Sequence, residues 1–458
     1  MRPVLAGLIC GWSTLLFAAA SAHAQTTAPD APPAAARSST APASAASSGA
    51  VDRIDLDDVR NFSRVYEVAR QAYVEKVDNK TLMRAAISGM LSGLDPHSEY
   101  LDKEGLTQLS EDTTGQYSGL GIEVLQVDGT LRIIAPIDDT PAARAGIKPG
   151  DTIVKVDGKA VDPENIDEMF KRLRGEPGSK ITLSILHEKS DTPVDLALVR
   201  ERISVTSVKL RPLEPGYVYI RISQFQDDTA ADLEKKLAAY VGKQGAPRGA
   251  VLDLRSNPGG LLTAAVAVSD EFLEAGTVVT TRGRLVDANM KFEAHPGDLL
   301  HGAPIVLLVD NGTASAAEIV AGALKDNQRA LIIGRRTFGK GVVQTVLPLD
   351  ADHAVKITTA RYYTPKGTSI QAEGIKPDIA LADLAVNKAD SAASLITSEA
   401  DLKHHLANEN ASAGTDIDND GSAENARLAT ADYALSQALN VLKGLALNRA
   451  APAAQRTH

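Results

Sequence analysis

Cysteine is almost absent from this chain of 458 residues, since Cys10 is the only one. It lies in the first apolar stretch, MRPVLAGLICGWSTLLFAAASAHAQ, which has Arg2 ahead of the apolar run and the cleavage pattern Ala22-His23-Ala24 at its end. This arrangement predicts a secretory signal peptide over residues 1–24, and an uncleaved membrane anchor is the alternative. Cleavage would leave no cysteine, which excludes a disulfide framework and a thiol nucleophile.

Positive charge is also scarce. The chain has 48 Lys and Arg against 58 Asp and Glu, a net charge of −10. Because phosphate groups are bound by basic surfaces, this balance argues against nucleic acid as a partner. Beyond the first segment, no stretch is apolar enough to span a bilayer. An exported chain without cysteine is typical of the bacterial periplasm, and we expect this protein there.

Composition and periodicity divide the rest of the chain into segments. A spacer rich in Ala, Pro and Ser is too polar and too poor in aromatics to order itself, so we expect a disordered linker. A helical region, a β-rich module with period-two strands, and a region of alternating strands and helices follow, and the last is typical of an α/β core. A polar tail with a weak helix ends the chain. The expected limits are 25–50 for the linker, 51–112 for the helical region, 113–200 for the β-rich module, 201–385 for the α/β core and 386–458 for the tail.

One serine stands where a buried strand is expected to turn into a helix. Ser315 follows the apolar run 304–310 and opens the stretch SAAEIVAGALKD. With Glu318 three residues later it forms a helix capping box, and capping alone is the simple interpretation. The same position suits a nucleophile, because a helix N-terminus offers free N–H groups to an oxyanion. The local pattern leaves both interpretations open.

A serine nucleophile needs a base, and no histidine lies within 311–344. Lys340 stands between two glycines in TFGKGVVQ, and its simple interpretation is a solvated lysine on a strand. As a base it would have to be neutral near pH 7, which requires burial. Gln344 would share a strand face with Lys340 and could orient its amine.

Two other side chains fit the role of a catalytic partner less well. His353 falls in an expected exposed hairpin turn. Asp326 is expected roughly 16 Å from Ser315 along one helix, at 1.5 Å per residue. We therefore expect a structural role for Asp326.

Two glycine turns could bind a substrate through backbone N–H groups. LDLRSNPGG, residues 252–260, ends an apolar strand, and the N–H of Gly259 or Gly260 could be an oxyanion donor; the alternative is a plain loop. SGLGI, residues 118–122, could turn N–H groups toward a peptide carboxylate while the following strand pairs with the peptide. That carboxylate loop would consist of Gly119, Leu120 and Gly121, with the strand starting at Ile122.

No metal site or other cofactor is expected. DIDNDG, residues 416–421, resembles the start of a calcium loop, but Arg427 stands where the loop needs a bidentate glutamate. His404 and His405 have no further ligand in the sequence around them.

Taken together, the motifs resemble those of the C-terminal processing peptidases, or tail-specific proteases. The motifs occur in the family's order over about residues 54–385, and the spacing of Ser315 and Lys340 is the most specific element. They are LDPHSEYL, SGLGIEV, RAGIKPGDTIVKVDG, LDLRSNPGG, NGTASAAEI, ALKDNQRALIIG and TFGKGVVQ. The resemblance implies an α/β fold: a crotonase-like α/β protease core, an inserted β-rich PDZ domain and an N-terminal helical region.

The resemblance also implies residue roles. Ser315 would attack the peptide bond, Lys340 would act as general base, and Gln344 would position the lysine. The oxyanion hole would be formed by the N–H of Ala316 and that of Gly259 or Gly260. The PDZ domain would bind substrate C-termini.

We therefore expect a periplasmic serine endopeptidase that acts on exported proteins with apolar C-termini. Further copies of the chain are expected partners, and a periplasmic adaptor protein is an open alternative. Two other functions are alternatives. A non-catalytic PDZ scaffold would lack Ser315 or Lys340, and a Ser-His-Asp esterase would need a histidine within reach of Ser315.

Overall fold

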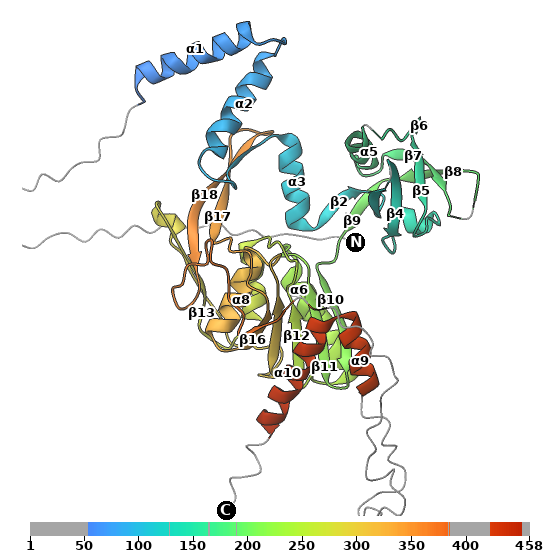
Figure 1. Cartoon of the computed structure of the whole chain (residues 1–458), viewed down its shortest axis with the longest axis vertical. Helices are drawn as coiled ribbons and strands as arrows, with labels where there is room; N and C mark the ends of the chain where they lie inside the picture. The colour runs from blue at the N-terminus through green and yellow to red at the C-terminus, as the bar shows by residue number, and fades with distance from the viewer. Residues whose placement is uncertain are drawn as a thin grey trace, which may run out of the picture. The chain divides into compact units, whose positions relative to one another are not determined.

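The computed structural model of the chain (Figure 1) describes residues 54–127, 129–163, 165–188, 190–382, 384 and 422–450. Within these residues the chain divides into two units, with the boundary between Glu75 and Lys76. The predicted signal peptide and linker lie outside the described residues. So do DIDNDG at 416–421 and the pair His404 and His405.

The first unit contains helix α1, Leu56–Ala72. The helix begins after Asp55, whose Oδ1 accepts a hydrogen bond from the Asp57 N–H at 3.0 Å and so satisfies one free donor of the first turn. The helical periodicity predicted for this segment is confirmed. No residue of α1 is buried, and its apolar side chains, including Phe62 and Val65, are exposed.

The second unit is built on a six-stranded sheet in the order β10-β11-β12-β15-β16-β19. The pair β10 and β11 is antiparallel, and all other neighbours are parallel. Helices alternate with the strands, as the α/β prediction requires. The elements are β10 Val208–Glu214, β11 Tyr217–Ile222, α6 Thr229–Gln244, β12 Gly249–Asp253, α7 Leu262–Asp270, β15 Ile305–Val309, α8 Ala316–Asp326, β16 Ala330–Gly334 and β19 Ile379–Ala380.

Helices cover both faces of this sheet. On one face, Leu252 and Leu307 pack with residues of α6, α7 and α8. On the other, Val251 and Val306 pack with Leu439 and other residues of α10. The last two helices are α9, Ser422–Ala431, and α10, Tyr433–Ala450. Helix α10 lies beside β12 and β15 (Figure 1). The segment that the sequence analysis assigns to the tail therefore supplies one layer of the core. None of the helices in the described ranges is long and apolar enough to cross a membrane.

A second sheet joins segments that are far apart in the chain. Its order is β1-β18-β13-β14, and β17 also pairs with β18. Strand β1 lies within residues 94–102, where the sequence has no strand pattern, because Glu99 pairs with Lys356 of β18. Such a distant partner cannot be seen in a local pattern. The elements are β1 Glu99–Leu101, β13 Thr277–Gly283, the 3-10 helix η1 Val286–Ala288, β14 Lys291–Glu293, β17 Val342–Pro348 and β18 Ala354–Tyr363.

A third sheet, in the order β3-β4-β5-β7-β8 with β6 paired to β5, forms the β-rich module. The period-two strands predicted for this module are present, and β3 and β4 form a hairpin in which Val127 pairs with Thr130. Strand β3 is at the edge of the sheet, so one side of it has no strand neighbour in the module. A ribbon of β2 and β9 precedes and follows this sheet, and α2 and α3 precede the ribbon. The elements are α2 Asn79–Ser92, α3 Lys103–Thr114, β2 Gln116–Gly119, β3 Ile122–Val127, β4 Thr130–Pro136, α4 Pro141–Arg144, β5 Thr152–Val156, β6 Lys159–Ala160, α5 Ile166–Leu173, β7 Lys180–Leu186, β8 Val194–Val199 and β9 Glu201–Ser204.

Candidate active site

Ser315 lies in the tight turn between β15 and α8. The predicted capping box is present, and the Ser315 N–H donates to Glu318 Oε2 at 2.8 Å. The Ser315 backbone has φ 55° and ψ −117°, a region that costs an L residue about 1–3 kcal/mol and that occurs mainly at functional sites. A serine on a strained strand-to-helix turn is also the arrangement that presents a nucleophile in α/β-hydrolases. The position therefore combines helix capping with a geometry suited to catalysis.

Glu318 connects this turn to the loop that carries Lys340. Its side chain is fully buried. Oε2 accepts the Ser315 N–H and, at 2.9 Å, the Lys340 N–H. Oε1 accepts the Gly339 N–H at 2.8 Å and the Thr337 hydroxyl. Burial raises the pKa of Glu318 above its ordinary value, although these hydrogen bonds act in the opposite direction. One carboxylate thus holds the backbones of both predicted catalytic residues against each other.

Tyr362 makes a second connection between the same two segments. It is buried, and its hydroxyl donates to the carbonyl oxygen of Lys340. The Ser315 hydroxyl also hydrogen-bonds the Tyr362 oxygen. Burial and the neighbouring Glu318 raise the pKa of Tyr362 well above its ordinary value, so its hydroxyl keeps its proton at neutral pH. Neither this tyrosine nor the bridging role of Glu318 was predicted from the sequence.

The Lys340 side chain is half-buried. Its pKa is lowered, first by burial and then by the ammonium of Lys356, while Asp95 and Glu99 act in the opposite direction. A lysine with a lowered pKa is more often neutral, as a general base must be. Within the described residues its ammonium makes no hydrogen bond to Ser315. The structure therefore brings the two segments together without a direct bond between the two side chains.

Gln344 follows a bulge in the β17–β18 pairing, between Val343 and Gln344. Lys340 precedes β17, which begins at Val342. The expected shared strand face does not hold, because the lysine is outside the strand and the bulge breaks the period of two. The Gln344 Nε2 donates instead to Thr358 Oγ1 at 3.2 Å.

Two predicted oxyanion donors lie beside Ser315. Ala316 is the first residue of α8, where the N–H has no partner within the helix. A Cβ atom added at Gly259 would lie 2.8 Å from the Ser315 Cβ and 3.0 Å from the Ala316 N, so only glycine allows this approach.

The Gly259 and Gly260 N–H groups differ. The Gly259 N–H donates to Asn257 Oδ1 at 2.9 Å. Gly260 forms a parallel β-bridge with Phe225. In this bridge the Phe225 N–H donates to the Gly259 carbonyl, and the Leu261 N–H donates to the Phe225 carbonyl. The N–H of Gly260 faces away from this bridge. Of the two glycines predicted as alternatives, Gly260 therefore has the available donor.

The side chains set aside as catalytic partners have other contacts. Asp326 Oδ2 accepts the Lys366 N–H at 3.0 Å, as a structural role requires. His353 lies in the turn between β17 and β18, where it bonds Asp350 at 2.8 Å and stacks on Tyr100. Among the described residues there is no group of three or more potential metal ligands.

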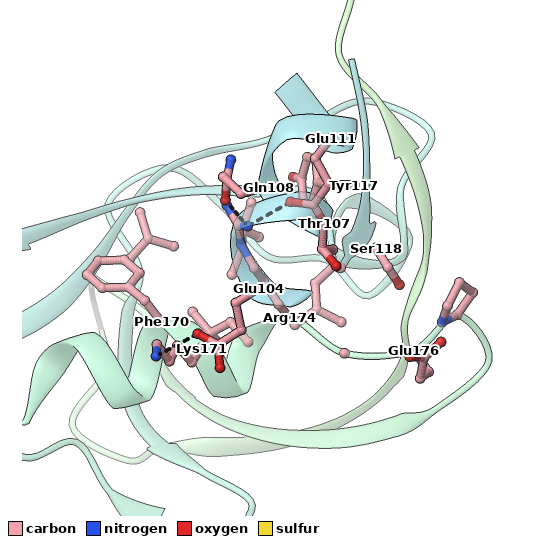
Figure 2. A pocket seen from close by; sticks show the side chains of 18 of the residues that line it. Glu104, Thr107, Gln108, Glu111, Tyr117, Ser118, Phe170, Lys171, Arg174 and Glu176 are labelled. Atoms are coloured by element: carbon pink, nitrogen blue, oxygen red, sulfur yellow. Dashed lines mark hydrogen bonds and ion pairs between the residues drawn. The ribbon is translucent and has the colours of Figure 1, made fainter. Parts of the chain in front are cut away.

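The predicted carboxylate loop lines a cavity of about 960 Å³. Figure 2 shows this cavity, which lies between the loop, α5 and α3. The Leu120 carbonyl accepts the Ala142 N–H at 3.0 Å, and the Gly121 carbonyl accepts the Ile137 N–H at 2.8 Å. Because C=O and N–H point in opposite directions across a trans peptide, the N–H groups of Gly121 and Ile122 point away from these partners. They are available to a ligand.

Arg174, at the end of α5, also lines this cavity and was not identified from the sequence. Its guanidinium donates to Gln108 at 2.8 Å and to Glu111 at 2.7 Å, both on α3 (Figure 2). Lys171 pairs with Glu104 of the same helix at 3.3 Å. Helix α3 thus borders the cavity with acidic side chains bound to the cations of α5. The only local signal for Arg174 in the sequence is that a basic residue stands at the end of an amphipathic helix.

Three parts of the chain match models of known protein families. Residues 216–381 match the model of peptidase family S41, residues 132–186 match a PDZ domain model, and residues 15–105 match the N-terminal domain of the activating protease CtpB. A carboxy-terminal-processing protease of Bartonella bacilliformis is 46% identical over 320 residues, which cover 69% of this chain and 74% of that protein. The chain belongs to peptidase family S41. The family predicted from the motifs is thereby confirmed: this is a serine-type peptidase of the carboxy-terminal-processing group with a PDZ domain.

Other S41 relatives are more distant. Chains of Staphylococcus aureus described as probable CtpA-like serine proteases are 36% identical over 336 residues, covering 72% of this peptidase and 66% of theirs. Among solved structures, a photosystem II D1 C-terminal processing protease has 31% identity, covers 70% of this chain and 92% of its own, and has a TM-score of 0.42. The peptide-bound PDZ domain of a Vibrio cholerae carboxy-terminal protease has 26% identity, covers 20% of this chain and 99% of its own, and has a TM-score of 0.19.

Proposed function

We propose that this peptidase hydrolyses peptide bonds of exported proteins with a Ser315–Lys340 dyad. The observation that carries the proposal is the shared carboxylate of Glu318, which binds the N–H of both residues. The bridging Tyr362 hydroxyl and the lowered pKa of Lys340 support it. A hydroxyl nucleophile and an amine base must be held close to each other. Here one buried side chain holds the serine turn and the half-buried lysine loop together.

The proposed reaction has two steps. The neutral Lys340 Nζ takes the proton of the Ser315 hydroxyl while Oγ attacks the scissile carbonyl. The oxyanion is bound by the N–H of Ala316 and of Gly260. The tetrahedral intermediate collapses, the peptide C–N bond breaks, and the lysine returns the proton to the leaving amine. This first step leaves the acyl part of the substrate as an ester on Ser315 Oγ. In the second step, water activated by the same lysine hydrolyses this ester and frees the serine.

The Lys340 side chain must move to reach Ser315. Its four-carbon stem is flexible, and catalytic hydrogen bonds are often formed only when substrate is bound. Gln344 is the proposed orienting group, because its amide oxygen accepts a hydrogen bond from an N–H of the amine.

The proposal predicts how the rate depends on pH. A lysine base acts when neutral, so kcat/KM should rise with pH through one ionisation with a midpoint below about 10.4, the ordinary value. Because the Lys356 ammonium lowers the pKa of Lys340, Lys356→Gln should move the midpoint to higher pH. Lys366→Gln removes a lysine that pairs with Asp326 instead and should leave it unchanged. Steady-state kinetics from pH 6 to 10 check this, and a flat profile contradicts a lysine base.

We also propose that the PDZ domain binds the substrate C-terminus at Gly119, Leu120, Gly121 and Ile122. The free N–H groups of Gly121 and Ile122 would bind the carboxylate, and the edge strand β3 would pair with the peptide. Arg174 offers a cation in the same cavity, where the incoming carboxylate would compete with Glu111. Apolar side chains of the substrate would contact Phe170 and Val124, which line the cavity.

Substrates with an amidated C-terminus should therefore be cleaved at least about tenfold more slowly at low concentration, since a charge-assisted hydrogen bond contributes about 1.5–3 kcal/mol. Gly121→Val should remove this difference, because a Cβ atom there would lie 2.3 Å from the Thr140 Cβ and distort the loop. Gly158→Val is the matched control. Gly158 has a similar φ of 76°, against 73° for Gly121, open space around it, and no place in the cavity lining. Equal cleavage of free and amidated substrates by the wild type would mean that the domain does not recognise C-termini.

Location, fold family and assembly belong to the same proposal. We propose that the chain is exported to the periplasm by its N-terminal signal peptide, and that its core has the crotonase-like α/β fold, with which the parallel strands β11, β12, β15 and β16 are compatible. We propose a homo-oligomer in which a second copy covers the exposed apolar residues of α1, such as Phe62 and Val65. A periplasmic adaptor remains part of the hypothesis.

A further inference from the structure

The turn Asp95–Ser98 is bound to β18 close to the proposed dyad. The Asp95 carboxylate accepts the His97 N–H at 2.8 Å, and the Ser98 N–H and hydroxyl at 3.0 and 2.8 Å. The Ser98 hydroxyl in turn accepts the Thr358 N–H at 3.1 Å. Strand β1, which follows the turn, pairs with β18. The turn is therefore fixed to β18 through both backbone and side chains.

Thr358 connects this turn to Gln344. The Thr358 hydroxyl donates to the Asp95 carboxylate and accepts a hydrogen bond from Gln344 Nε2 at 3.2 Å. Gln344 and Thr358 are opposite residues of β17 and β18, next to the bulge at Val343. A continuous chain of hydrogen bonds thus runs from Asp95 through Thr358 to Gln344.

The charge of Asp95 decides which groups donate and which accept along these hydrogen bonds. Burial raises the pKa of its carboxyl, but the bonds from Ser98, His97 and Thr358 lower it further and leave it below the ordinary value. The carboxylate is therefore ionised at neutral pH and can only accept hydrogen bonds. A hydroxyl has one proton, so Thr358, which donates to Asp95, must accept from the Gln344 NH₂ group. The orientation of the amide follows from this network, and its Oε1 remains available.

We propose that Asp95 and Thr358 are positioning residues of this peptidase, which fix the Gln344 amide so that its Oε1 binds the Lys340 amine and directs the nitrogen lone pair toward Ser315. This inference rests on the proposed dyad. It also gives the segment before the PDZ domain a role in catalysis, because Asp95 belongs to that segment.

Several charged groups surround the lysine, and they decide which variants are informative. Lys356, Asp95 and Glu99 act on Lys340, and Lys340 and burial lower the pKa of His97. Substituting any of these changes the pKa of Lys340 directly. Thr358 carries no charge, so its variants report on the hydrogen-bond chain alone.

The test compares Thr358→Val, which keeps the shape but loses both hydrogen bonds, with Thr358→Ser, which keeps the hydroxyl. Thr359→Val is the matched control, because Thr359 makes an exposed cross-strand hydroxyl contact with Thr345 at 2.6 Å on the same two strands. For Thr358→Val we expect kcat to fall between about tenfold and 100-fold, as for a misplaced catalytic group, with KM unchanged. The pH midpoint should move down, because an oriented carbonyl favours the ammonium form. Thr358→Ser and Thr359→Val should match the wild type.

A double mutant shows whether Thr358 acts through Gln344. Gln344→Ala with Thr358→Val should be no slower than Gln344→Ala alone, because the two residues form one unit. Additive losses would overturn the inference. So would equal activity of Thr358→Val and Thr359→Val in a peptidase that Lys340→Ala inactivates. Full activity of Lys340→Ala would instead refute the dyad, and this inference with it. Circular dichroism of each variant confirms that the fold is intact.

Discussion

Replacing Ser315 or Lys340 by alanine is expected to abolish cleavage of an unfolded protein substrate while the fold is retained. Each substitution should lower kcat by at least about 10⁴-fold, as in other serine peptidases that lose a nucleophile or base. The double variant should be no worse than either single one, since the two groups act in one proton transfer. Neither side chain is part of the apolar core, so thermal unfolding should change little. Cleavage rates measured with one unfolded protein and three variants check this.

The matched control is Asp326→Ala. Asp326 is a charged residue of α8, but its carboxylate holds the Lys366 N–H, so its loss should affect stability and leave kcat nearly unchanged. Full activity of Lys340→Ala would refute the assignment of the base. Unchanged cleavage by Ser315→Ala would mean that a different group is the nucleophile.

Glu318→Ala is expected to remove both stability and activity. The substitution leaves four donors without their acceptor: those of Thr337 and Gly339 are buried, and those of Ser315 and Lys340 are part-buried. An unsatisfied buried polar group costs about 1–3 kcal/mol, so we expect a loss of at least about 3 kcal/mol in the free energy of unfolding. The folded fraction should also lose kcat, because the turn and the loop are no longer held together. Urea unfolding and single-turnover cleavage measure the two effects.

Glu318→Gln separates the two roles of the carboxylate. An amide keeps one acceptor oxygen, so either the pair Ser315 and Lys340 or the pair Thr337 and Gly339 loses its acceptor. The stability loss should be smaller than for alanine, while activity should still fall. Glu373→Ala is the control, because this exposed glutamate forms only a long ion pair with Arg336 at 3.8 Å. Wild-type kcat in folded Glu318→Ala would show that the shared carboxylate is not needed for catalysis.

Much of the candidate site could be predicted from the sequence because its signals are local. A serine between a strand and a helix, a lysine between glycines and a Pro-Gly-Gly turn are each visible in a short window. The structure agrees that Ser315 opens α8 and that Gly259 contacts it closely. The choice between Gly259 and Gly260 as donor could not be made, because it depends on Asn257 and Phe225, which use the other groups of that turn.

The predicted shared strand face of Lys340 and Gln344 is wrong for a physical reason. It assumed an uninterrupted strand, while the lysine precedes β17 and a bulge follows Val343. A bulge is decided by how two strands pair, and its partner strand is β18. The same holds for β1, whose residues have no strand pattern of their own and pair only because β18 is next to them.

The sequence by itself determined the class of this protein: a C-terminal processing peptidase with an α/β core, a PDZ domain, a serine at a strand-to-helix turn and a lysine between glycines. Only the tertiary structure decided how these parts are joined. The sequence indicates only a helix cap at Glu318, whereas in the structure Glu318 also binds the Lys340 loop. The sequence indicates only a strand residue at Thr358, whereas in the structure Thr358 connects Asp95 to Gln344. The sequence places α10 in a polar tail, whereas in the structure this helix covers a face of the central sheet. In each case the partner is distant in the chain, and hydrogen bonds and apolar packing depend on distance in space, which a local pattern of residues does not contain.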